Sequence, residues 1–395
     1  MLFPAPSHLY KINSNDILQY VVYGVNRFTF SFLIVSYHDA QSRNTRWSQS
    51  AVNALSVEPL DKTSPLFGDL SAFASGVSRE SVEDTADNLG LAIKYEGSYY
   101  PLRNTAFKSL ADRAKVGGSS LPKLTRPDLA TVLNKCLSLH TASALLLIRD
   151  EKVSATHSGD DKDYSVLAIN ELIQSIQAKL DERFEGNTFD SGYTDHCITS
   201  ASWSLPKQRD ELLGTYKKLL DAQGQFVMAT KLIPGIRFCT SDTGLASAKV
   251  AAMLLGLSYP IHIGAMLAVE HRGQKTVSDF SANLDLMFAQ FVDAIAALEK
   301  LTTIYLDYPV NAMTAVCKKL SMPKKAALEA IEMFNISTSG TRVTAHDVFM
   351  GLQEIIFTLK SEGMSEGKLL VIEENLARAL SLRWRDYDLA RKVSY

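Results

Sequence analysis

One segment of the chain combines positive charge with aromatic side chains, which is the composition that a surface for single-stranded nucleic acid requires. Residues 90–152 carry ten Lys and Arg against five Asp and Glu, a net charge of +5, whereas the whole chain has a formal net charge of −2. Cations follow the phosphates of a nucleic acid, and exposed aromatic rings stack on its bases. The residues predicted to do this are Lys94, Tyr95, Tyr99, Tyr100, Arg103, Lys108, Arg113, Lys115, Lys123 and Arg126.

A structural interpretation of the same segment competes with the nucleic-acid hypothesis. The cations over 105–115 would then form the solvated face of a helix, and Phe107 on the same helix would belong to the core. The tyrosines over 95–100 would pack a hairpin instead of contacting bases. Both interpretations are open at the level of sequence.

A second candidate site is the polar sequence over 240–244. A strand over 235–239, followed by a helix over 245–255, would place hydroxyl and backbone N–H groups at a helix N-terminus, where phosphate or carboxylate binds. The glycine patterns of the Walker and Rossmann loops are absent, and Thr240 to Asp242 could simply cap the helix. The residues of this alternative anion site are Thr240, Ser241, Thr243, Gly244 and Lys249.

Other catalytic and metal-binding patterns are weak. Histidines stand beside acidic residues at Asp195-His196, Glu270-His271 and His346-Asp347, and His157 precedes three aspartates, but none has the spacing of a zinc or calcium motif. No Gly-x-Ser-x-Gly elbow or recognisable catalytic cysteine is present. We therefore expect no metal and no cofactor, and the sequence leans against an enzyme.

The elements that must position these residues are predicted from hydrophobic periodicity and helix caps. The fold class is α+β (mixed), with a strand-plus-helix body over 1–277, a further boundary between 90 and 150, and a helical region over 278–395. The predicted strands and hairpins lie over 17–37, 91–100, 144–157, 197–203, 235–239 and 261–270. The predicted helices lie over 81–90, 105–115, 169–183, 245–255, 278–301, 309–320, 323–334, 344–359 and 366–384, with one more starting near Pro127.

Composition narrows the class of protein. The chain has 395 residues, of which 46% are hydrophobic and 21% charged, and these values exclude disordered, collagen-like and coiled-coil proteins. Four cysteines without a C-x-x-C pair are expected to be reduced and mostly buried. The N-terminus lacks the features of a secretory signal, and the apolar stretch 21–37 is too polar for a membrane span. We expect a cytoplasmic protein without a membrane partner.

Three regions resemble a family of phage/plasmid-like proteins of unknown function that occurs on mobile genetic elements. They are Lys152–Ser158 with Asp163–Leu167, Pro234–Gly244 with Glu270–Gly273, and Thr341–Glu354 with Glu373–Asp388. The chain departs from the family's Cys-Asn pairing, because Thr240 follows Cys239. The resemblance implies a phage or plasmid context, and so the cytoplasm of a bacterial host, but it supplies no catalytic residues.

Three hypotheses follow from these patterns. The first is a phage or plasmid protein that binds single-stranded DNA or RNA through residues 90–126, as a homo-oligomer that aligns or anneals strands. The second is an enzyme that acts on a nucleotide or phosphorylated ligand at residues 240–244. The third is a structural or inhibitory protein whose helical C-terminal region binds another protein.

Overall fold

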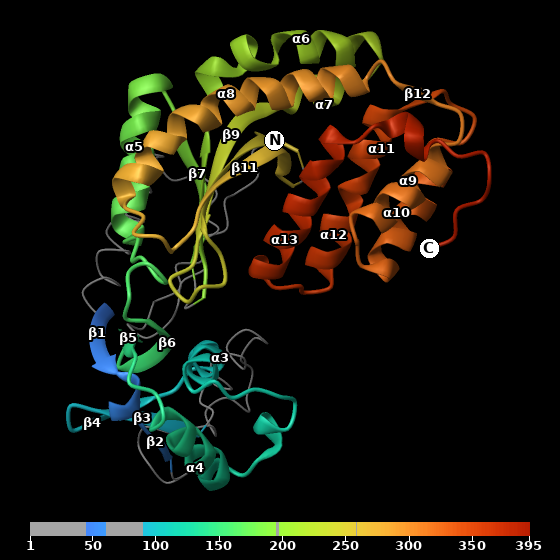
Figure 1. Ribbon diagram of the computed structural model, residues 1–395. Coiled ribbons are helices and arrows are strands. Elements are labelled where there is room, and N and C mark those ends of the chain that lie inside the picture. Colours follow the sequence, from blue (N-terminus) through green and yellow to red (C-terminus); the bar gives the residue numbers. More distant parts are fainter. Residues whose placement is uncertain (1–44, 61–89, 195–196, 258) are drawn as a thin grey trace, which may run out of the picture.

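The computed structural model describes residues 45–60, 90–194, 197–257 and 259–395, and its fold is mixed α+β with a helical C-terminal region, as predicted. The strands predicted over 17–37 and the helix predicted over 81–90, apart from Gly90, lie outside the described residues. Figure 1 shows an N-terminal lobe, a central sheet with long helices against it, and a group of C-terminal helices beside the sheet. Together these parts form a crescent.

Among the described residues, the N-terminal lobe contains two antiparallel three-stranded sheets and two α-helices. One sheet has the order β1-β5-β6 and the other the order β2-β3-β4. Helix α3 packs on β6 and α4 on β2, where Asn134 bonds both backbone groups of Val57 at 2.7 Å. The bounds are Thr45–Ala51 for β1, Ser56–Pro59 for β2, Leu91–Tyr95 for β3, Ser98–Pro101 for β4, Asn104–Arg113 for α3, Arg126–Leu137 for α4, Ser143–Arg149 for β5 and Lys152–Ser158 for β6.

Local sequence explains these elements well. The β3–β4 hairpin turns at Glu96 and Gly97, whose φ angles of 48° and 80° are those of the tight turns that match strand twist. Thr125 caps α4 by accepting a hydrogen bond from the Asp128 N–H. The predicted hairpins over 91–100 and 144–157 and the predicted helices over 105–115 and from Pro127 are therefore confirmed.

The central sheet is a five-stranded antiparallel meander in which each strand pairs with the next along the chain. Its order is β7-β8-β9-β10-β11. The strands span Thr188–Thr194 for β7, Thr199–Ser204 for β8, Ile233–Thr240 for β9, Ala248–Leu255 for β10 and Ile261–Val269 for β11. Three further helices of this part are α5 (Ile169–Arg183), α6 (Arg209–Ala222) and α7 (Phe226–Lys231).

Helices cover both faces of this sheet. On one face Ile236 and Phe238 of β9 pack in a core with α5 and with α8, which spans Val277–Leu301. On the other face Arg237 of β9 and Lys249 of β10 reach α13, which spans Glu366–Ala377. Helix α8 is long and apolar enough to cross a bilayer by length and composition alone, but its apolar stripe lies in the core against the sheet.

The helix predicted over 245–255 is wrong, because these residues form a loop and then β10. Ala, Leu and Met favour helices in isolation, and the run shows no alternation of apolar and polar residues. A strand buried on both faces reads as such a continuous apolar run. β10 lies between β9 and β11 with helices over both faces, so tertiary burial outweighs local propensity.

The C-terminal region follows α8. Thr344 and Asp347 form the predicted capping box at the start of α11, but the helix predicted over 344–359 breaks at Gln353 into α11 and α12. The helix predicted over 366–384 ends earlier, at Ala377, and continues as short 3-10 turns. The bounds are Tyr305–Leu306 for β12, Pro309–Lys319 for α9, Lys324–Ser337 for α10, Val343–Thr344 for β13, Ala345–Leu352 for α11 and Glu354–Ser361 for α12.

The predicted division at residue 277 stays a prediction. Helix α8 begins at that position, and its Phe280 and Leu284 pack with the sheet. Further along, Phe291 and Leu298 of the same helix belong to a core shared with the C-terminal helices. One helix thus contributes to two cores.

His262 of β11 lies between the sheet and α13 without a hydrogen-bond partner on either ring nitrogen among the described residues. The residue is 3% exposed, and burial, assisted by the charges of Arg237 and Lys249, lowers the pKa of His262 to about 3. Its imidazole is therefore neutral in the folded protein at pH values where the unfolded chain binds a proton.

Replacing His262 by leucine should reduce the acid sensitivity of the fold. In the wild type, the buried neutral histidine does not reduce the free energy of unfolding above pH about 6.5, the pKa of a histidine in the unfolded chain. Below that pH, the free energy of unfolding falls by about 1.4 kcal/mol for each pH unit down to about pH 3. Between pH 7 and pH 5, the free energy of unfolding measured with urea should therefore fall by about 2 kcal/mol less in the variant than in the wild type. An identical loss in both proteins would contradict a neutral buried His262.

Candidate nucleic-acid interface

The exposed part of the predicted basic surface is a set of five cations and one aromatic ring on the N-terminal lobe. Lys94 of β3 stands opposite Tyr99 of β4, with its amine 5.4 Å from the ring centroid, and the tyrosine is 42% exposed. A base could stack on such an exposed ring. The other exposed cations of the set are Lys108, Lys115, Lys123 and Arg126. We call these six residues the exposed basic set.

The remaining predicted residues are not free to contact a nucleic acid in the same way. Tyr100 is 7% exposed, and its hydroxyl accepts a 2.7 Å hydrogen bond from Arg46, whose guanidinium also lies over the ring. Tyr95 is half-buried and donates to the backbone oxygen of Gln49 at 3.1 Å. These two tyrosines pack a hairpin, as the structural interpretation of the sequence expected.

Two predicted arginines are also partly or wholly withdrawn from solvent. Arg103 precedes α3, is 4% exposed and lies 3.9 Å from the carboxylate of Asp150. Arg113 at the end of α3 is half-buried and lies close enough to His157 for its charge to contribute to the low pKa of that histidine. Of the ten predicted residues, six are therefore exposed. The other four are buried or half-buried and contribute to the fold.

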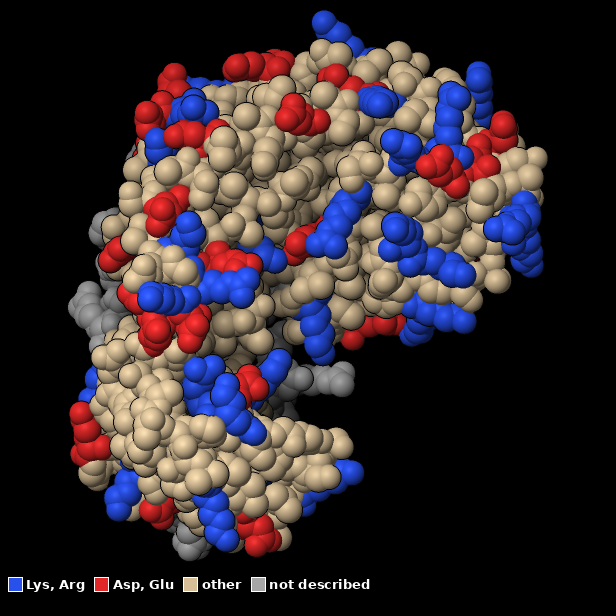
Figure 2. All heavy atoms as spheres, viewed as in Figure 1, with Lys and Arg blue, Asp and Glu red and all other residues tan. Residues whose placement is uncertain are grey.

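Positively charged side chains are also seen on the surface of the N-terminal lobe. Figure 2 shows Lys and Arg side chains gathered over and beside α3, on the side of the N-terminal lobe that faces the hollow of the crescent. The C-terminal helices on the opposite side of the hollow also present Lys and Arg in this view. A strand lying across the lobe at α3 would therefore meet positive charge.

Residues 240–244 lead from the last residue of β9 toward β10, and all of them except Gly244 are buried. Thr240 and Ser241 are at most 1% exposed. The Ser241 hydroxyl donates to the Cys197 backbone oxygen at 2.5 Å and accepts from the Leu245 N–H, and Thr243 donates to the same Cys197 oxygen at 3.3 Å. The Ser241 and Thr243 hydroxyls thus hold the loop against Cys197, just before β8, and the Thr240 hydroxyl pairs with His271 at 3.1 Å.

The other two residues of the predicted anion site have different contacts. Gly244 adopts a φ of +79° in the turn and lies against the imidazole of His157. Lys249 is on β10 and forms a 2.8 Å ion pair with Glu374 of α13. Because the helix that should have offered its N-terminus is a strand, the geometry gives the anion site no support.

Asp242, in the middle of this loop, is the centre of a buried polar cluster that the sequence did not reveal. Its carboxylate forms a 2.8 Å ion pair with Arg149 of β5. Its backbone oxygen accepts hydrogen bonds from His157 Nε2 at 2.8 Å and from the Tyr164 hydroxyl at 2.9 Å. Arg149 and His157 belong to the N-terminal lobe and Asp242 to the central sheet, so the cluster joins these two parts.

Aromatic stacking and burial complete this junction. The rings of His157 and Tyr164 stack at 3.6 Å, and His271 stacks on the other side of Tyr164 at 5.7 Å. Burial lowers the pKa of His157 to about 4 and raises the pKa of Tyr164. It also raises the pKa of Asp242, an effect that the charge of Arg149 opposes. Arg149, His157, Tyr164 and Asp242 are thus occupied with one another, which favours a structural role.

The other residues considered as metal ligands or nucleophiles do not form a site. Among the described residues, no group of three or more His, Cys, Asp or Glu side chains is arranged to hold a metal. His196 lies outside the described residues, and His346 is bound to the hydroxyl of Tyr216 at 2.6 Å. Cys239 and Cys317 are buried, and burial raises the pKa of each thiol to about 12, which makes both poor nucleophiles.

Sequence reasoning missed the junction because its members come from four separate segments. The sequence indicates His157 and His271 only as histidines close to acidic residues, without the spacing of a zinc or calcium motif. The chain matches no protein-family model, no curated protein and no solved structure with which it was compared. The proposed function therefore rests on the geometry of the described residues.

Proposed function

We propose that the N-terminal lobe binds single-stranded nucleic acid, in a protein of a phage or plasmid. The observation that carries the proposal is the exposed Lys94–Tyr99 pair on the same lobe as four other exposed cations. The ring offers a stacking surface, and the cations neutralise phosphates. In Figure 1 the β3–β4 hairpin with Lys94 and Tyr99 lies at the outer edge of the lobe and α3 on the side toward the hollow, so a strand that contacts both crosses the lobe toward the Lys and Arg near α3 in Figure 2.

The proposal favours single strands over duplexes. Stacking on Tyr99 requires a base that is not paired inside a helix, whereas cations alone attract any nucleic acid. The resemblance to phage/plasmid-like proteins supports the biological setting. Assembly into an oligomer that aligns strands stays a prediction, as does the alternative of a nucleotide-processing enzyme.

Replacing Lys108, Lys115 and Lys123 by alanine together should weaken binding of a labelled single-stranded oligonucleotide. Because each lysine neutralises about one phosphate, the plot of log affinity against log salt concentration should become less steep, with a slope smaller in magnitude by roughly 2. The measurement is fluorescence anisotropy at several salt concentrations.

Tyr99→Ala should instead weaken binding by roughly tenfold with little change in the salt slope, because it removes the ring on which a base stacks.

A matched control removes three exposed lysines elsewhere. Lys218 of α6, Lys300 of α8 and Lys319 of α9 are all exposed and lie outside the N-terminal lobe. Their replacement by alanine changes the net charge by the same amount. Equal weakening in the control and in the N-terminal variant would contradict a site on the N-terminal lobe.

A further inference from the structure

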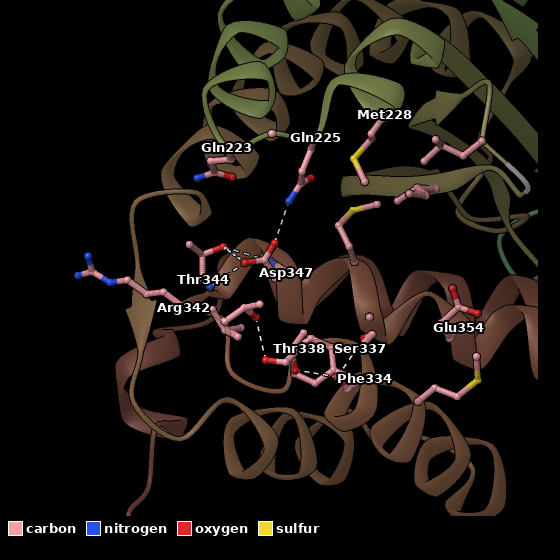
Figure 3. Close-up of a pocket in the computed structure, with 18 of the residues that line it drawn as sticks. Gln223, Gln225, Met228, Phe334, Ser337, Thr338, Arg342, Thr344, Asp347 and Glu354 are labelled. Carbon is pink, nitrogen blue, oxygen red and sulfur yellow. Dashed lines mark hydrogen bonds between the residues drawn. The ribbon is translucent and has the colours of Figure 1, made fainter.

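A cavity of about 1240 Å³ lies far from the exposed basic set, between the central sheet and the C-terminal helices. Its walls are the α6–α7 turn, the β10–β11 turn, and α10 and α11 with the β13 strand that precedes α11. Figure 3 shows these walls, with Gln225 extending from one side toward Asp347 on the other. Pockets for small organic ligands usually enclose about 300–1,000 Å³, so this cavity exceeds that range.

The lining is mostly apolar and rich in methionine. Met228, Phe334 and Met350 line the cavity, and Met333 at its edge is 56% exposed. Methionine side chains adapt to differently shaped apolar partners, and surfaces that bind peptides use them for that reason. The apolar surface continues outward, because the Tyr259 ring in the lining contacts Phe357 of α12, which is 55% exposed.

Two polar groups of the lining have an acceptor atom that is open to a ligand. Gln225 donates its amide to Asp347 at 2.9 Å, which leaves its buried Oε1 atom without a partner among the described residues. Glu354 accepts a 2.9 Å hydrogen bond from the Tyr259 hydroxyl through one carboxylate oxygen only. In Figure 3 these two acceptors stand on different walls of the cavity.

Of the two positive groups of the lining, Arg342 is directed away from the cavity. Arg342 lies 3.7 Å from the centroid of the Tyr305 ring, and Figure 3 shows it pointing away from the centre of the cavity. Lys231 is exposed at the end of α7. Asp347 is fully engaged, because Thr344 and Gln225 together bond both of its carboxylate oxygens.

We propose that this cavity binds a peptide segment of another protein that carries apolar side chains and a Lys or Arg. The apolar side chains pack on the methionines, the cation pairs with Glu354, and a peptide N–H donates to Gln225 Oε1. The separation of the two acceptors and the size of the cavity fit an extended ligand with several donors.

The test uses the full chain and a fluorescein-labelled 12-residue peptide of alternating Leu and Lys, a pattern that favours the extended backbone that the proposed contacts require. Saturable binding is expected by anisotropy, and a matched peptide with Glu in place of Lys should bind at least tenfold more weakly. Glu354→Gln keeps the hydrogen bond with Tyr259 but removes the charge, and should weaken binding of the Leu/Lys peptide about tenfold. Met228→Lys should abolish binding while the melting temperature shows that the variant is folded.

Glu332→Gln is the control, because Glu332 is an exposed carboxylate of α10 outside the cavity lining. It should leave peptide affinity unchanged. The proposal is overturned if the Leu/Lys peptide does not bind, if the Leu/Glu peptide binds equally well, or if Glu332→Gln weakens binding as much as Glu354→Gln. Octylamine that binds as tightly as the peptide would likewise overturn it in favour of a small amine ligand.

Discussion

Replacing Arg149 by methionine is expected to lower the free energy of unfolding by about 3–5 kcal/mol, because it leaves the Asp242 carboxylate buried without its cation. Arg149 is 5% exposed and Asp242 is 8% exposed, and their 2.8 Å ion pair joins β5 of the N-terminal lobe to the β9–β10 turn. Removing one partner of a buried pair costs far more than removing the pair. Urea unfolding followed by circular dichroism measures the change.

The double variant Arg149→Met/Asp242→Asn separates lost charge pairing from lost packing. Because asparagine is neutral, the double variant should recover most of the stability that Arg149→Met loses. Arg272→Met is the matched control, since Arg272 pairs with Glu270 on the surface and both side chains are more than half exposed. The control should cost less than about 1 kcal/mol.

The pH dependence of Arg149→Met gives a second readout. Burial already raises the pKa of Asp242, and loss of Arg149 removes the charge that opposes this rise. A carboxyl whose folded pKa lies above its unfolded value destabilises the fold at high pH, and protonation relieves this as the pH falls. The stability difference between variant and wild type should therefore shrink from pH 7 to pH 5. A constant or growing difference would contradict a buried, unpaired carboxylate.

Replacing Trp203 by alanine is expected to cost about 3–5 kcal/mol, as for other large buried side chains. Trp203 of β8 is 1% exposed and lies in the core between the central sheet and α5. Its indole N–H donates to Gln177 of α5 at 2.9 Å, and its ring meets Phe189 edge to face at 6.0 Å. The variant therefore loses packing and the hydrogen bond from the indole to Gln177. Chemical denaturation with a constant m-value checks the loss.

Two comparison variants define the origin of that loss. Trp203→Phe retains most of the apolar volume and should lower the free energy of unfolding much less than Trp203→Ala. Its remaining loss comes from the missing hydrogen bond to Gln177. Leu245→Ala removes a side chain that is 62% exposed and should change stability by under about 0.5 kcal/mol. A Trp203→Ala loss no larger than that of Leu245→Ala would show that the sheet and α5 do not share this core.

Elements with strong local signals were predictable from the sequence. The helix predicted over 169–183 has the same bounds in the structure, because Leu172, Ile176 and Leu180 recur at helical spacing and are buried against one sheet. The capping box at Thr344 is likewise a pattern of four consecutive residues. Such signals depend only on neighbours in the chain.

Features that depend on distant partners were not predictable. Tyr99 and Tyr100 are adjacent and identical in type, yet one is exposed and the other is covered by Arg46, which lies 54 positions earlier. Asp242 looked like a helix cap because its partner Arg149 is 93 positions away. The residues over 245–255 looked helical because burial on both faces of β10 removes the alternation that marks a strand.

The central claim is that the exposed basic set binds single-stranded nucleic acid, and a salt titration of the full-length wild-type protein with a labelled single-stranded oligonucleotide tests it most directly. If Lys94, Lys108, Lys115, Lys123 and Arg126 each neutralise a phosphate, log affinity should fall linearly with log salt with a slope of roughly −3.5. An unlabelled duplex of equal length should compete less well than the single strand. No binding at the lowest salt concentration, or affinity that does not change with salt, would contradict the proposal.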